Sequence, residues 1–199
     1  LYFFFKKYLS WKENYLVCFC GYGTHALLDA CTSYGTHLFW PFSSSRIAWN
    51  FISVIDPIFT LPMIILCIFG SIKRARCYVI LGLGWGLLYL SLGVIQNTRA
   101  LNLGTALAIS RGHSPHQLSV KPSFGNLLIW KGIYEFEGFY YIDAIRLTLN
   151  PEYCPGQRIE KLNLKKHLGN LNHDSQQAYD IERFRAFSSD YLSFNSKKS

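Results

Sequence analysis

Two long apolar runs, separated by a short basic segment, constrain this chain more than any other feature of its sequence. Phe51–Gly70 holds 20 residues and Tyr78–Ile95 holds 18, and between Phe51 and Ile95 very few residues are charged. A helix needs roughly 20 mostly apolar residues to cross about 30 Å of hydrocarbon. Both runs therefore predict membrane-spanning helices.

Charge is concentrated in the other half of the sequence. Of the 32 formal charges, 22 lie in residues 96–199. This segregation predicts two parts, a transmembrane helical region over residues 1–95 and a small extramembrane α+β domain over residues 96–199. The expected fold class is therefore membrane α-helical, with about three transmembrane helices, followed by that α+β domain. The expected location is the membrane, as a multi-pass protein.

The basic segment Ser71–Cys77 predicts the orientation of the chain. It carries three positive charges and no negative one, and positively charged loops remain in the cytoplasm. The run that follows then leaves the cytoplasm, so the α+β domain is expected on the outer side, which in a bacterium is the periplasm. Residues from Asn14 to about Thr32 would form the first span. The chain opens in mid-pattern at Leu1 rather than at Met, which suggests a truncated N-terminus.

The net charge of +8 divides evenly between the two parts, and no concentrated basic run with interleaved aromatics is present. We therefore expect the lipid bilayer as a partner and no nucleic acid. Four of the six cysteines lie in apolar stretches and only Cys154 lies in the polar half, so no disulfide framework is implied.

Residues after Gln96 show mixed helical and strand patterns. Ala100–Ser110 has helical apolar spacing. A last helix capped by Asp174 or Ser175 is also expected, with Ala178, Ile181, Phe184 and Phe187 on one face. Aromatic and β-branched residues predict strands, with Glu137–Gly138 as a hairpin turn. The expected strands are Asn126–Trp130, Gly132–Phe136 and Phe139–Leu149.

His25 and Asp29 are the first candidates for chemistry. They are four residues apart, so on a helix they share a face and could hold one divalent cation together with further ligands. Imidazole suits zinc and other transition metals, so the expected cofactor is a divalent metal ion such as zinc. Ionisable groups are costly in an apolar segment and mark functional sites there, although a hydrogen-bonded pair within the helix bundle is the alternative. His37 could add a third ligand or could simply be solvated.

Asp56 is the second candidate. Followed by Pro57, it matches the pattern of a helix N-cap with proline at the first helical position. An N-cap carboxylate near the membrane surface can also face a site, so Asp56 is predicted as a catalytic residue as well as a cap.

A family resemblance rests on two blocks of sequence. Residues 25–43, which begin His-Ala-Leu-Leu-Asp and end Leu-Phe-Trp-Pro-Phe-Ser, are followed by Ile55–Pro62 with its Asp-Pro. Together they resemble the bacterial membrane-bound metal-dependent hydrolase family of the YdjM/YbcI type, also described as LexA-binding and inner-membrane-associated. Residues 121–130 and 183–188 are similar to the C-terminal part of that family.

The resemblance implies a multi-pass protein of the bacterial inner membrane with His25 and Asp29 as metal ligands. Asp56 matches the family's Asp-Pro and would be a further ligand or the base that orients a water molecule. Family members also carry an upstream His-Arg-Gly-x-Thr-His-Ser type motif, which nothing in this chain matches. The expected function is a membrane-bound metal-dependent hydrolase acting on a lipid-like substrate. The alternative is a non-catalytic inner-membrane protein whose α+β domain binds an unidentified protein partner.

Overall fold

The computed structural model describes residues 10–169, 171–172, 175–188 and 190–194. The chain divides into two compact units, Leu1–Leu90 and Ser91–Ser199, and the boundary falls inside one long helix. The opening residues, which include the suspected truncation point, and the predicted cap Asp174 lie outside the described residues.

The first unit is helical. Helix α2 covers Trp11–Cys31 and begins with a capping box, in which Ser10 and Glu13 each bond the other's backbone amide. Helix α3 covers Pro57–Lys73, with Asp56 as N-cap, as the sequence predicts. The helix ends where Arg74 adopts a left-handed conformation, with φ of 50°. The predicted basic loop is therefore shorter than expected, because both helices extend into it.

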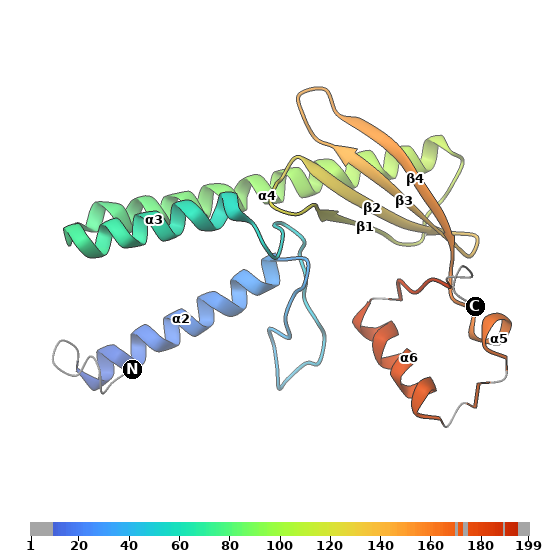
Figure 1. Cartoon of the computed structure of the whole chain (residues 1–199), viewed down its shortest axis with the longest axis horizontal. Coiled ribbons are helices and arrows are strands. Elements are labelled where there is room, and N and C mark those ends of the chain that lie inside the picture. Colours follow the sequence, from blue (N-terminus) through green and yellow to red (C-terminus); the bar gives the residue numbers. More distant parts are fainter. Residues whose placement is uncertain (1–9, 170, 173–174, 189, 195–199) are drawn as a thin grey trace. The chain divides into compact units, whose positions relative to one another are not determined.

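Helix α4 covers Arg76–Ser110 without a break. The sequence predicts a span over Tyr78–Ile95 and a separate helix over Ala100–Ser110, but the structure joins them. The joining residues 96–99 contain no glycine or proline to interrupt the helix, so the backbone hydrogen bonds continue. The C-terminal part of α4 lies against a sheet, as Figure 1 shows.

That sheet is antiparallel, with strands in the order β1-β2-β3-β4. The strands are Leu118–Pro122, Ile129–Phe136, Phe139–Arg146 and Glu152–Glu160. The hairpin at Glu137–Gly138 is confirmed, with φ of 49° and 75° at its two turn residues. The α+β character of this unit is therefore confirmed, and short helices α5 (Leu164–His167) and α6 (Gln176–Phe187) follow the sheet. Ser175 caps α6, as one of the two predicted alternatives.

The strands differ from the predicted ones at several places, and β1 covers residues that the sequence did not predict as a strand. Two expected strands merge into β2 because Gly132 stays in register opposite Asp143, and the Ile145 side chain lies 3.3 Å from the place where a Cβ of residue 132 would stand. Strand β4 was not predicted, since Pro155 and Gly156 argue against a strand. It forms at the sheet edge and pairs with β3 around an irregularity between Ile142 and Ala144.

The core of the second unit lies between α4 and one sheet face. Ala100 on the helix packs against Trp130 and Ile145 from the sheet, all almost completely buried. Gly104 lets the helix approach, because Leu118 and Ile145 methyl groups lie about 3.5 Å from the place where a Cβ would stand. Small residues on α4 thus determine how closely the helix meets the strands.

The prediction of about three spanning helices is only partly met. Within the described residues, α4 alone is both long and apolar enough to cross a membrane. Helix α3 has 17 residues, a length of about 26 Å at 1.5 Å per residue, which falls short of the hydrocarbon thickness. Helix α2 is long enough but carries Lys12, Glu13 and Asp29, which lower its hydropathy.

Candidate metal-binding residues and the polar clusters

The predicted pair His25 and Asp29 lies on one face of α2. The imidazole Nε2 stands 3.5 Å from the Asp29 Oδ2, as expected for positions one helical turn apart. The His25 side chain is 71% exposed and that of Asp29 45%, so both groups remain accessible from outside the protein chain. The spacing expected from the sequence therefore does bring these two possible ligands together.

The turn after α2 fixes the end of the helix that carries Asp29. The Thr32 hydroxyl donates to the Asp29 carbonyl oxygen and accepts from the amide of Gly35. Gly35 has φ of 71°, and a Cβ there would lie 2.3 Å from the carbonyl oxygen of Ile47. The loop over residues 33–50 returns to the helix end, where the Trp49 amide donates to the Ala30 carbonyl oxygen.

Asp56 lies in a different environment. It is only 3% exposed, and its Oδ1 accepts the Phe59 amide at 3.2 Å as the N-cap of α3. Its Oδ2 accepts the Tyr89 hydroxyl of α4 at 2.7 Å. Oδ1 therefore caps α3 and Oδ2 joins α3 to α4, and a catalytic role for Asp56 stays a prediction beside this structural one.

The residues present fit a metal ion only in part. Among the part of the chain that the structure describes, no group of three or more His, Cys, Asp or Glu side chains converges on one point. His37 is exposed and does not complete a set with His25 and Asp29. The described residues thus provide two neighbouring ligands, which is fewer than a structural or catalytic zinc site requires from protein.

A second polar cluster, which the sequence did not reveal, lies between α4 and the sheet. The Arg111 guanidinium makes a bidentate pair with Asp143, at 2.7 and 3.0 Å, and also donates to the Tyr134 hydroxyl. Its bonds to the Asp143 carboxylate raise the pKa of Arg111 above its ordinary value. His113 contacts the same Tyr134 hydroxyl at 2.9 Å and stacks on Phe136. A charged residue inside the predicted strand Phe139–Leu149 was the available signal for this cluster.

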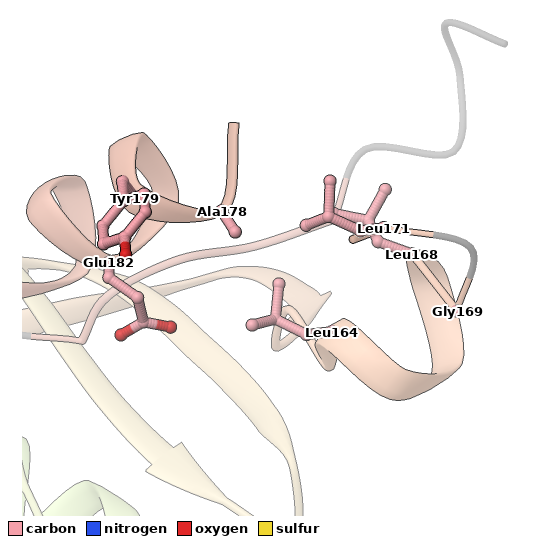
Figure 2. A pocket seen from close by; sticks show the side chains of 7 residues that line it. All are labelled: Leu164, Leu168, Gly169, Leu171, Ala178, Tyr179 and Glu182. Atoms are coloured by element: carbon pink, nitrogen blue, oxygen red, sulfur yellow. The ribbon is translucent and has the colours of Figure 1, made fainter. Parts of the chain in front are cut away.

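A hollow between α5 and α6 is one concave feature near polar groups. Its volume is about 260 Å³, and Figure 2 shows Glu182 and Tyr179 of α6 facing leucines from the α5 side. None of the predicted site residues lines it. Its lining is Leu164, Leu168, Gly169, Leu171, Ala178, Tyr179 and Glu182.

The comparison with known families concerns the helical unit and the start of the second. A family model described as YdjM inner membrane protein matches residues 1–100, just over half of the chain. The chain belongs to the YdjM inner membrane protein family. No curated protein and no solved structure matches it at a significant level.

Membership of the YdjM family confirms the resemblance drawn from the His-x-x-x-Asp and Asp-Pro blocks, and it identifies the chain as an inner-membrane protein. The matched residues include His25, Asp29 and Asp56 as well as the apolar part of α4. The sheet and its Arg111–Asp143 cluster lie beyond the match. The family description specifies no reaction, so any chemistry rests on the residues themselves.

Proposed function

We propose that this chain is a membrane-bound metal-dependent hydrolase, in which His25 and Asp29 supply two ligands to a divalent cation. The observation that carries the proposal is their placement, 3.5 Å apart on one accessible face of α2. The remaining ligands would come from outside the described residues or from another chain. Zinc suits the imidazole, and the carboxylate accepts several divalent ions.

We further propose that the protein is multi-pass. Helix α4 would span the inner membrane, and α3 would cross beside it with Lys73 and Arg74 extending towards the headgroups to compensate for its short length. Within the helical unit, Asp56 and Tyr89 join α3 to α4, which supports their insertion as a pair.

A bound divalent cation would lower the pKa of a coordinated water towards about 7 and so provide hydroxide at neutral pH. His25 and Asp29 would hold and orient that ion, since both side chains are partly exposed and could be reached by it. A site on a membrane helix favours a lipid-like substrate, because such a molecule already lies at the same depth in the bilayer.

Metal content of the purified full-length protein tests the proposal. We expect bound divalent metal in the parent and a loss of most of it in a His25→Ala, Asp29→Ala double variant, with hydrolysis of phosphorylated lipids lost in parallel. His116→Ala is the matched control, because His116 is an exposed histidine outside the pair. Equal metal content in the parent and the double variant would rule the metal site out.

One observation favours a second function, that of a non-catalytic inner-membrane protein whose α+β domain binds a partner. Both oxygens of Asp56 already accept hydrogen bonds within the protein, and the described residues form no three-ligand group. On this alternative, His25 and Asp29 only hydrogen-bond within the helix bundle, and the double variant loses stability but no activity. Activity assays on the same variants separate the two functions.

A further inference from the structure

The loops at one end of the sheet carry apolar side chains that the described residues of the second unit leave exposed. Phe124 and Leu128 belong to the β1–β2 loop, and Leu149 belongs to the β3–β4 loop. Leu149 is 99% exposed and Phe124 is 69% exposed, whereas other leucines of the same domain are buried in its core. Large apolar side chains gathered at one place mark an interaction surface rather than a random scatter. We call these three residues the apolar tip.

The two loops form one structure. The Leu147 amide donates to the Leu128 carbonyl oxygen at 2.6 Å, and Ile129 pairs with Arg146 at the ends of β2 and β3. Asn126 fixes the first loop, because its side-chain oxygen accepts the amides of Leu128 and Ile129. Figure 1 shows both loops at the same end of the sheet. The tip is therefore held in place by its own hydrogen bonds.

Helix α4 determines where that tip lies along the membrane normal. The Gln96 side chain donates to the carbonyl oxygens of Leu127 and Leu147, one in each loop. Arg99 donates to the Thr148 carbonyl oxygen at 2.8 Å. Both loops are thus bonded to a single turn of α4.

That turn of α4 is where the apolar run ends. Residues 76–95 form 20 residues of helix, about 30 Å long, which equals the hydrocarbon thickness of a bilayer. Leu92 and Ile95 are still exposed apolar side chains, whereas Gln96, Asn97 and Arg99 are polar or charged. If α4 spans the membrane, Gln96 and Arg99 lie at the headgroup level, and so do the loops bonded to them.

We propose that the apolar tip inserts into the membrane interface beside α4. The sheet domain then contacts the bilayer at two places, through α4 and through the tip. The occupant of this surface is the acyl–headgroup boundary of the same bilayer that α4 crosses. Arg99 next to the tip suits the anionic headgroups around it, and Arg146 there forms an exposed ion pair with Glu152. The hairpin at Glu137–Gly138, at the other end of β2 and β3, then points away from the membrane. The inference rests on the proposal that α4 is a membrane span.

Depth-dependent fluorescence quenching tests the proposal in the full-length protein. Single cysteines at Leu149, Phe124, Glu137 and Leu87 are introduced into a chain whose six native cysteines are replaced by serine or alanine. Each is labelled with an environment-sensitive fluorophore and reconstituted into phosphatidylethanolamine–phosphatidylglycerol vesicles. Leu87 reports on α4 itself, and Glu137 is the matched control in the same domain. A native far-ultraviolet circular dichroism spectrum is required of each variant, and a tip position whose cysteine unfolds the chain is replaced by Leu128, the third residue of the tip.

We expect brominated lipid to quench the labels at 149 and 124 several times more strongly than the label at 137, which aqueous iodide should quench instead. Lipid quenching of the label at 87 without lipid quenching at 149 would overturn the insertion of the tip but leave α4 as a membrane span. No lipid quenching at 87 would overturn the span and the tip together. A label at 149 protected from both quenchers would show that protein, such as a second copy, covers the tip, and would also overturn the proposal.

Discussion

Two buried carboxylates among the described residues are each paired with a group on α4 or directly after it, and the pairing explains why they are tolerated. Asp56 receives the Tyr89 hydroxyl, and Asp143 receives the Arg111 guanidinium. A buried charge without such a partner would cost several kcal/mol, roughly the range seen when one member of a buried pair is removed. At the scale of single residues, these pairs are therefore the most sensitive positions.

Replacing Asp143 tests this at the sheet. Asp143→Ala should lower the free energy of unfolding by about 3 kcal/mol, because Arg111 would keep its charge without its partner. The Gly156 amide would also lose its acceptor. Glu152→Ala is the control, since the Arg146–Glu152 pair is exposed and should change stability by less than about 1 kcal/mol. Thermal unfolding in detergent measures both, and equal losses would contradict the importance of the buried pair.

Alkaline pH should destabilise the sheet through Tyr191 and Lys161. Burial raises the pKa of Tyr191 to about 12. Burial by itself would lower the pKa of Lys161, but hydrogen bonds to Asp190 and Glu135 raise it above its ordinary value. In the unfolded chain both groups lose protons from about pH 10 upward, so the unfolded state then binds fewer protons than the folded state. Stability is therefore complete below about pH 10 and falls as the pH rises towards 12.

The measurement is the denaturant midpoint at neutral pH and at about pH 11. Tyr191→Phe should reduce the loss between the two conditions, because the variant has no phenol to ionise at that place. An identical pH dependence in the parent and the variant would contradict the assignment.

At the scale of elements, Asp56 decides how α3 begins and how it meets α4. Asp56→Ala should cost about 1 kcal/mol for the lost cap, and more for the unpaired Tyr89 hydroxyl. Asn is also a good cap, so Asp56→Asn should keep most of the stability. Thermal unfolding and lipid hydrolysis are measured together. A stable Asp56→Asn variant that loses hydrolysis would support the catalytic prediction, and one that keeps it would leave only the structural role.

Glycines on α4 form a contact face towards α3 within the helical unit. A Cβ at Gly86 would lie 3.8 Å from the Met63 sulfur, and one at Gly82 would lie 3.8 Å from the Leu66 Cβ, whereas one at Gly84 would meet nothing within 4 Å. Gly86→Leu should therefore separate α3 from α4 at a cost of about 1–3 kcal/mol. Gly84→Leu is the matched control and should be close to neutral. A greater loss for the Gly84 variant, by thermal unfolding in detergent, would contradict this contact face.

At the scale of the whole molecule, orientation is the property that remains to be measured. The basic residues Lys73, Arg74 and Arg76 between α3 and α4 predict a cytoplasmic turn, which places the sheet domain in the periplasm. A reporter that works only in the cytoplasm should then be active when it is fused at Ser71. A reporter that works only in the periplasm should be active when it is fused to the C-terminal end. A cytoplasmic signal from the C-terminal fusion would reverse the proposed orientation.

The sequence alone determined the features that depend on neighbours a few residues apart. The apolar runs, the His25–Asp29 spacing, the cap at Asp56 and the hairpin at Glu137–Gly138 all follow from local periodicity and turn chemistry, and the structure contains each of them. Together with the family blocks, they were sufficient to identify an inner-membrane protein. The number of spans did not follow from the apolar runs alone, because among the described helices only α4 is both long and apolar enough, and α3 is shorter.

Only the tertiary structure decided which distant residues meet. Asp56 and Tyr89 are 33 positions apart, and Arg111 and Asp143 are 32 apart, so no local pattern records either contact. The same holds for β4, whose proline and glycine are tolerated because it lies at the sheet edge beside β3. The continuity of α4 from the apolar run to the sheet also required the structure, because each part of the pattern alone is typical of a separate helix. Local sequence rules therefore limit the secondary structure of each segment, and packing between segments decides which distant residues come into contact.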